Sequence, residues 1–134
     1  MKYLLDTHLC IAIIKRKPAA ALNRILQHAA DDLGVSSLTV GELRHGAERS
    51  AYPQQNHAAL DAFLAPLVVA HFDSAAAARY GALRAELERE TLPLGPLETI
   101  IAAHALSLGA TLATSKAGEL AGIPGLEIEN WSET

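Results

Sequence analysis

The N-terminal stretch, residues 2–8, constrains the fold of this chain more than any other part of the sequence. Residues 3–5, Tyr-Leu-Leu, form a short apolar run without polar alternation, which is typical of a strand buried on both faces of a parallel sheet. Asp6 follows directly, so its carboxylate is expected at the carboxyl end of this strand, where open α/β sheets collect their ligands. Asp6 has a second interpretation, because aspartate is also an ordinary N-cap for a following helix.

Short β-prone runs and stretches of helical periodicity alternate along the rest of the chain. After the first strand, strands are predicted at residues 34–39, 67–72, 110–115 and 126–129, and helices at residues 9–14, 19–30, 40–50, 58–64, 75–90, 99–108 and 117–121. This alternation predicts an α/β fold, in which a mainly parallel sheet of about five strands carries helices on both faces. The 134 residues suffice for a single domain, 1–134, with a sizeable core.

Composition narrows the class of protein. Half of the residues are hydrophobic but only 4% are aromatic, so the core consists of Ala, Leu, Ile and Val side chains, which suits helices packed on a sheet. The single cysteine, Cys10, excludes an internal disulfide and favours a cytoplasmic protein. The sequence shows neither a basic-plus-apolar targeting segment nor an apolar run of about 18 residues, so no membrane association is expected.

The charges are unevenly distributed along the chain. The formal net charge of −4 argues against indiscriminate binding to nucleic acid, but the first 49 residues are richer in Lys and Arg than in Asp and Glu. Lys15, Arg16 and Lys17 form a basic run at the end of the first predicted helix. They are candidates for contacting phosphate groups, and a solvated basic helix end is the alternative interpretation.

Two further acids occupy positions like that of Asp6, just past a strand or at a helix N-terminus. Glu42 lies in the first turn of the helix predicted after the second strand, where it completes a capping box with Thr39 as N-cap. Capping alone is therefore the alternative role of Glu42. Glu98 follows the Pro- and Gly-containing loop 91–97 and begins an almost wholly apolar helix, where the helix dipole by itself would favour an acid.

Three carboxylates at one edge of a sheet predict a metal site. Converging carboxylates repel one another unless they are protonated or bound to a hard cation, and Mg²⁺ or Mn²⁺ prefers such oxygen ligands. A divalent ion at this edge suits phosphodiester chemistry, because it activates a water nucleophile and neutralises charge on the phosphate. The six scattered histidines lack the spacing of a zinc site, and neither a nucleotide-phosphate loop nor a nucleophilic-serine motif is present.

Several segments together resemble the PIN-domain ribonucleases of the VapC toxin type. They are residues 4–8, 36–43, 95–98 with 101–106, 112–115, and 124–126 with 130–131, in the family's order along nearly the whole chain. The resemblance implies a PIN-like α/β/α sandwich and an endoribonuclease that uses Mg²⁺ or Mn²⁺. It further implies the toxin of a type II toxin–antitoxin system, which cleaves RNA, with tRNA as one candidate, and inhibits translation until a VapB-type antitoxin binds. A homodimer is implied as well.

Carried over by position, the family's acidic metal-site residues correspond to Asp6, Glu42 and Glu98, all predicted to be catalytic, with Asp6 and Glu98 as metal ligands. His8 departs from the family pattern because it stands where asparagine is usual. Glu98 replaces an aspartate and reaches further by one methylene, and Ser115 with Lys116 replaces the usual polar pair after the fourth strand. Supporting roles are predicted for Thr7, His8, Thr114, Ser115 and Glu119, and contacts to RNA for Lys15, Arg16, Lys17 and Arg44.

Two other functions fit part of this pattern. These departures favour, as the alternative, a catalytically impaired PIN domain that acts mainly as an antitoxin- or RNA-binding module. A receiver-like phosphoacceptor domain also gathers acids at strand ends around Mg²⁺. That class needs paired acids near the first strand, where Asp6 stands alone, and a lysine after the last strand, for which Lys116 is the one candidate. Purified protein that binds RNA but never cuts it with Mg²⁺ or Mn²⁺ would favour the impaired PIN domain.

Overall fold

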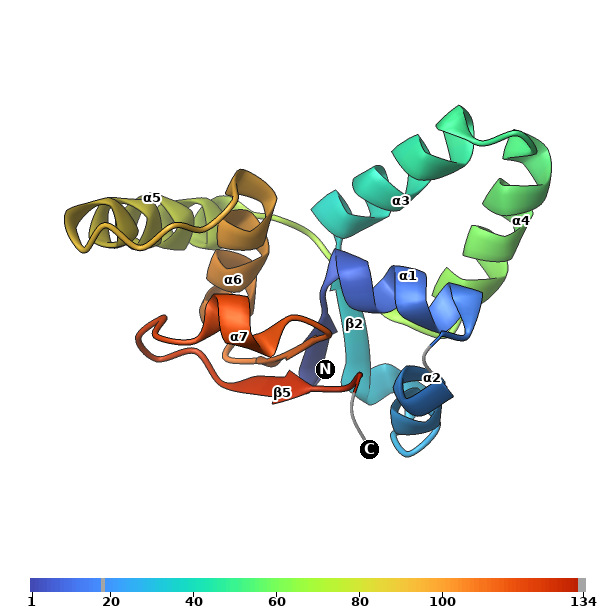
Figure 1. Ribbon diagram of the computed structural model, residues 1–134, viewed down its shortest axis with the longest axis horizontal. Coiled ribbons are helices and arrows are strands. Elements are labelled where there is room, and N and C mark those ends of the chain that lie inside the picture. The colour runs from blue at the N-terminus through green and yellow to red at the C-terminus, as the bar shows by residue number, and fades with distance from the viewer. Residues whose placement is uncertain (18, 133–134) are drawn as a thin grey trace.

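Strands and helices alternate along the chain, as the sequence predicts, in a computed structural model that describes residues 1–17 and 19–132 (Figure 1). The strands are β1 (Tyr3–Leu5), β2 (Leu33–Ser36), β3 (Val68–Ala70), β4 (Thr111–Thr114) and β5 (Ile128–Asn130). The helices are α1 (Thr7–Lys15), α2 (Ala19–Ile25), α3 (Ser37–Arg49), α4 (Pro53–Leu64), α5 (Ser74–Arg89), α6 (Pro96–Leu108) and α7 (Ala117–Leu120), with a 3₁₀ turn at Ala30–Asp32.

The five strands form one parallel sheet in the order β3-β2-β1-β4-β5, which confirms the predicted α/β class. The first strand of the chain is the central one, because Leu4 pairs with Gly34 of β2 on one side and with Leu112 of β4 on the other. Its central place explains why this strand is apolar without alternation. The carboxyl ends of β1, β2 and β4 therefore meet at the same edge of the sheet.

Helices cover both faces of the sheet, with α1 to α4 on one side and α5 to α7 on the other (Figure 1). Successive residues of β1 feed the two cores, since Leu5 packs with the α1–α4 side and Leu4 with the α5–α7 side. Both leucines are fully buried. The sheet is thus the middle layer of an α/β/α sandwich. Among residues 1–17 and 19–132, no helix is both long enough and apolar enough to span a membrane.

The second strand ends three residues earlier than predicted, and this changes the interpretation of Thr39. Ser36 is the N-cap of α3, because its Oγ accepts a hydrogen bond of 3.1 Å from the amide of Leu38. Thr39 lies inside the helix with its side chain fully buried, so the predicted capping box is wrong. Glu42 consequently lies beyond the first turn of α3, where it caps nothing.

Candidate active site at the carboxyl edge of the sheet

Asp6 stands at the end of β1 and serves both roles that the sequence suggests. It is the N-cap of α1, since its Oδ1 accepts a 2.8 Å hydrogen bond from the amide of Leu9. Its Oδ2 accepts a hydrogen bond from the hydroxyl of Thr114, at the end of the neighbouring strand β4. Thr114 is fixed in turn, because its Oγ1 accepts a 2.9 Å bond from the amide of Lys116. The side chain of Asp6 is buried, and these contacts hold its carboxylate at the edge of the sheet.

Burial raises the pKa of the Asp6 carboxyl above its ordinary value of 3.8. The hydrogen bonds from Thr114 and the amide of Leu9, together with the nearby His8, oppose this rise, while the charge of Glu98 adds to it. The two carboxylates therefore interact electrostatically across the site. A cation placed between them would relieve both the burial cost and the repulsion.

Glu98 is the third residue of α6, in the helix's first turn. Its Oε1 lies 3.9 Å from Nε2 of His8, on the first turn of α1. The other carboxylate oxygen folds back over Gly95, the N-cap of α6, so that a Cβ at this glycine would come within 2.3 Å of it. Glu98 thus occupies a space that exists because residue 95 has no side chain.

A small pocket of about 20 Å³ lies between the two acids and is lined by Asp6, Thr7, His8, Leu97, Glu98, Ile101, Leu112 and Leu120. This volume has room for about one water molecule or ion, for which roughly 10–15 Å³ is needed. The donor set fits Mg²⁺, which is usually held by one or two carboxylates, with water and substrate phosphate as its other ligands. Each oxygen of Asp6 accepts one hydrogen bond and so retains a free lone pair for a cation.

A layer of hydroxyls supports the edge of the sheet behind the acids. The Oγ1 atoms of Thr7 and Thr39 lie 3.1 Å apart, so they join the start of α1 to the first turn of α3. Behind them, Ser36 and Nδ1 of His104 form a buried hydrogen bond of 2.9 Å, and burial lowers the pKa of His104. Thr39, Ser36 and His104 were not among the site residues predicted from the sequence. In the sequence, these residues could have been recognised as polar side chains at positions where the strand or helix pattern is otherwise apolar.

Glu42 is not brought to the two other acids. It is exposed on α3 and lines a separate groove with Ile11, Ile14 and Lys15. Among residues 1–17 and 19–132, no three Asp, Glu, His or Cys side chains lie close enough together to hold one metal ion. The structure thus assembles a pair of carboxylates, Asp6 and Glu98, and the catalytic role of Glu42 stays a prediction.

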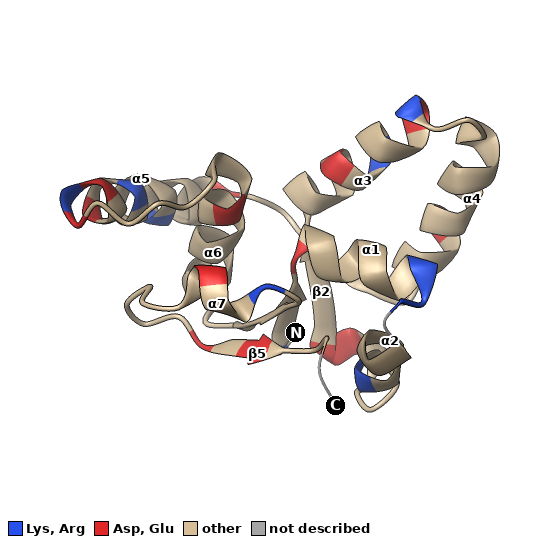
Figure 2. Cartoon of the chain, in the orientation of Figure 1, with Lys and Arg blue, Asp and Glu red and all other residues tan. Residues whose placement is uncertain are grey.

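The single acid of α6 is Glu98 itself, and α7 carries one further acid, Glu119 (Figure 2). Glu119, in the first turn of α7, is exposed and lines a larger groove together with Glu98. Ser115 follows β4 and is partly buried, and Lys116 beside it is exposed. Glu119 is therefore a further acid that shares a groove with one member of the pair.

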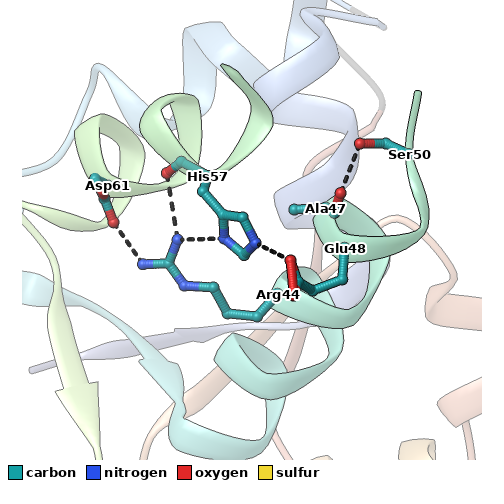
Figure 3. Close-up of polar contacts among 6 residues, drawn as sticks. All are labelled: Arg44, Ala47, Glu48, Ser50, His57 and Asp61. Atoms are coloured by element: carbon teal, nitrogen blue, oxygen red, sulfur yellow. Dashed lines mark hydrogen bonds and ion pairs between the residues drawn. The ribbon is translucent and has the colours of Figure 1, made fainter. Parts of the chain in front are cut away.

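The predicted RNA-binding cations lie away from the carboxylate pair. Lys15, Arg16 and Lys17 are at the opposite end of α1 from Asp6, roughly 13 Å along a nine-residue helix. The guanidinium of Arg44 is engaged within the α3–α4 hairpin: it donates to Nδ1 of His57 at 3.1 Å and to Asp61 at 2.6 Å (Figure 3). Arg44 thus holds α3 to α4, and any contact to RNA would compete with these bonds.

The family model of the PIN domain matches residues 3–118. The tRNA(fMet)-specific endonuclease VapC of Shigella flexneri is 39% identical over 98% of this chain and 99% of its own length. The protein of the same name in Salmonella typhimurium is 40% identical, with 98% of each chain covered.

Solved structures agree with these relatives over the whole fold. DNA-bound VapBC from Salmonella typhimurium superposes with a TM-score of 0.92 at 40% identity, covering 98% of both chains. VapBC2 from Rickettsia felis, bound to a promoter DNA fragment, gives a TM-score of 0.91 at 35% identity and covers 98% of this chain and 99% of that one. From the family match, the full-length relatives and the shared fold, we conclude that the chain belongs to the PIN-domain family and, within it, to the VapC-type ribonuclease toxins.

Proposed function

We propose that this ribonuclease toxin is a Mg²⁺- or Mn²⁺-dependent endoribonuclease whose substrate is the initiator tRNA. The observation that carries the metal dependence is the pair of carboxylates, Asp6 and Glu98, on a pocket large enough for one ion. The tRNA substrate is supported by two relatives, 39% and 40% identical over nearly their whole length, that are named as tRNA(fMet)-specific endonucleases.

Asp6 and Glu98 would hold the ion. When bound, such an ion activates a water molecule for attack and neutralises charge on the scissile phosphate. The protein contributes position: the amide of Leu9 and the hydroxyl of Thr114 fix the carboxylate of Asp6 before substrate arrives. Thr7 lines the same pocket, and its hydroxyl lies 3.1 Å from that of Thr39, so it can orient a water molecule without leaving its own hydrogen bond.

The side chains around the pocket also limit what enters it. Leu97, Ile101, Leu112 and Leu120 also line the pocket and give it an apolar wall beside the acids. A low-dielectric wall of this kind strengthens the attraction between the carboxylates and a cation. His8, which is partly exposed at the rim, faces Glu98 and can donate a hydrogen bond to it or to a phosphate oxygen.

A VapB-type antitoxin is the partner that keeps this activity in check. Structures of relatives at 40% and 35% identity contain VapB and VapC together, so the corresponding complex is proposed for this chain. We propose in addition that the toxin forms a homodimer in the cytoplasm. Inhibition of translation would follow from cleavage of initiator tRNA, because no other tRNA starts protein synthesis.

The test is cleavage of purified initiator tRNA by the purified protein, measured against Mg²⁺ and Mn²⁺ concentration, with elongator tRNA and the Asp6→Asn protein in parallel. Selective, metal-dependent cleavage that a co-purified antitoxin suppresses is expected. Binding of tRNA or antitoxin without cleavage at any metal concentration would instead favour the catalytically impaired PIN domain. Size-exclusion mass of the free toxin tests the homodimer separately.

A further inference from the structure

A second, much larger cavity opens directly beside the acid pair. This α7 groove has a volume of about 700 Å³, within the range of roughly 300–1,000 Å³ that is usual for small-molecule sites. The end of α5 and loop 91–95 supply one part of its lining, and α7 with the residues after it supplies the other. Figure 1 shows these segments on the α5–α7 side of the sheet. Glu98 lines both this groove and the ion-sized pocket, so the two cavities share one wall residue.

The lining of the α7 groove suits a nucleobase better than a sugar–phosphate. Leu87, Leu92, Leu94 and Ile123 make it largely apolar, and none of its lining residues is Lys or Arg. A phosphate group would find no cation there, whereas the face of a base can pack against leucine side chains. The polar side chains of the lining are acids, and ionised carboxylates accept hydrogen bonds but donate none.

We propose that the α7 groove is the subsite for the unpaired base next to the scissile phosphate, and that Glu119 selects a base with an amino group. This subsite presupposes the endoribonuclease function proposed above. With a phosphate at Asp6 and Glu98, this groove is the adjacent cavity available to the next base, because Glu98 lines both cavities. Glu119 accepts a hydrogen bond from the amino group of cytosine, adenine or guanine, which uracil lacks.

A neighbouring groove continues the path for a single strand. It measures about 260 Å³ and shares Leu87, Leu92 and Leu94 with the α7 groove. Tyr80 and Arg84 line it, and the guanidinium of Arg84 is exposed while it donates a 3.2 Å hydrogen bond to the Tyr80 hydroxyl. An aromatic ring beside an arginine is a common platform for single-stranded RNA. This continuation favours RNA over an antitoxin peptide as the occupant.

The experiment measures RNA binding in the Asp6→Asn background, so that no cleavage occurs. The probe is a fluorescein-labelled RNA hairpin with a single-stranded loop, together with versions in which each loop nucleotide in turn is abasic. One abasic position should weaken binding by roughly tenfold, the scale of one base–protein stacking contact. Ala121→Trp, which fills the groove, and Leu92→Ala, which removes part of its wall, should weaken the intact RNA and leave that abasic RNA unaffected.

Two matched variants control for general damage. Leu108→Ala removes a leucine that is 41% exposed, against 39% for Leu92, at the far end of α6. Ala85→Trp adds the same ring as Ala121→Trp at an exposed alanine of α5 that lines neither groove. Neither control should alter RNA binding. At the sensitive position, cytidine should bind more tightly than uridine, and Glu119→Gln should reduce that preference.

Groove variants that weaken intact and abasic RNA equally, or weaken neither, would overturn the subsite. Loss of antitoxin binding with RNA binding intact would also overturn it and would assign the groove to the antitoxin. Cleavage by the wild-type protein is measured separately with Mg²⁺ and Mn²⁺. Wild-type protein that never cleaves, but whose groove variants show the predicted pattern with abasic RNA, would refute the proposed cleavage and leave the groove as a base-binding site only.

Discussion

Asp6 and Glu98 reach the same pocket from two regions of different construction, the β1–α1 junction and the first turn of α6. The β1–α1 junction lies between paired strands, and two hydrogen bonds fix the buried carboxylate of Asp6. At the start of α6, Glu98 is about one-third exposed and is bounded by His8 and by the open space over Gly95. One proposed metal ligand is therefore held by hydrogen bonds at a strand end, and the other is restricted only by the shape of its neighbours.

This difference indicates where the site can change without losing the fold. A substitution at Asp6 disturbs a helix cap and a strand contact together, whereas Glu98 lies beside a glycine and a histidine and caps no helix. Fixing the glutamate side chain in one conformation costs about 1 kcal/mol or more of conformational entropy, and this cost is greater than for the shorter aspartate. Its position depends on the partners that restrict it.

The largest effect is expected at the fixed ligand. Asp6→Asn should lower RNA cleavage by at least ~100-fold, because one negative charge of the metal site is lost while Asn still caps α1. The fold should persist, since Oδ1 of asparagine can accept the amide hydrogen of Leu9. Cleavage rate and thermal melting of the same preparation test both points. Full activity in this variant would remove Asp6 from the metal site.

The pH dependence of thermal stability, measured without metal, tests separately whether the carboxylate of Asp6 is buried. Its folded pKa lies above the unfolded value of 3.8, so its contribution to stability is greatest below pH 3.8 and is lost as pH rises through the folded pKa. The metal-free Asp6→Asn protein should lack this loss and should melt at a higher temperature than the wild type at pH 7. A lower melting temperature would mean that the lost hydrogen-bond geometry outweighs the relief of burying a charge.

At the adjustable ligand, Glu98→Asp should lower cleavage by roughly 10- to 100-fold, because a misplacement of about 1 Å is costly. The shorter carboxylate cannot keep its place between His8 and Gly95. Glu98→Gln should lower the rate further, since the charge is lost too. The rate is measured against Mg²⁺ and Mn²⁺ concentration, with Glu90→Gln, on exposed chain at the end of α5, as control.

Two other outcomes of the Glu98 assays would contradict this expectation. A higher rate in Glu98→Asp, with tighter Mg²⁺ dependence, would mean that glutamate impairs the natural site. Unchanged rates and metal dependence in both variants would reduce Glu98 to a helix-terminal charge.

A smaller effect is expected when the space over Gly95, which the carboxylate of Glu98 occupies, is filled. Gly95→Ala places a Cβ that would lie 2.3 Å from the carboxylate oxygen, so Glu98 must turn away and metal affinity should fall by roughly tenfold. Gly95 has a φ of −62°, which alanine adopts readily, so the fold should tolerate the change. Calorimetric titration with Mn²⁺ measures the affinity. Gly81→Ala on α5, where an added Cβ meets nothing within 4 Å, should leave it unaltered.

The least effect on cleavage is expected behind the site, where Ser36 and His104 meet. Ser36→Ala removes the cap of α3 and leaves Nδ1 of His104 buried without its partner, which should cost about 1–3 kcal/mol of stability. The rate of the folded fraction should stay within a few-fold of wild type. Chemical denaturation and cleavage assays distinguish this result from a direct role, in which activity would fall while stability held.

The protonation of His104 should make the protein less stable as the pH falls. Its folded pKa lies below the ordinary 6.5, so its contribution to stability is complete above pH 6.5 and is lost as pH falls through the folded pKa. Thermal melts of the wild type should therefore decline below pH 6.5. The histidine is fully buried, and replacing it with leucine should flatten that part of the profile.

Sequence patterns predicted the layered fold because they report local burial. Residues 3–5 read as a central strand, and β1 is the central strand. The apolar helix after loop 91–97 is α6, with five fully or almost fully buried residues along Ile101 to Ala105. Boundaries were less secure at Thr39, because a threonine after a β-prone run suits a cap and a buried helical position equally. Packing against Thr7 decided between them.

The sequence by itself determined the parallel sheet, the two helical layers and the place of Asp6, since an apolar run followed by an acid fixes a strand end through short-range burial alone. Tertiary structure decided which acids meet. Glu42 and Glu98 have similar local signals, yet α3 leaves Glu42 on an exposed groove while α6 places Glu98 against His8. Distances between segments far apart in the chain depend on how helices pack across the sheet, and no local periodicity encodes them.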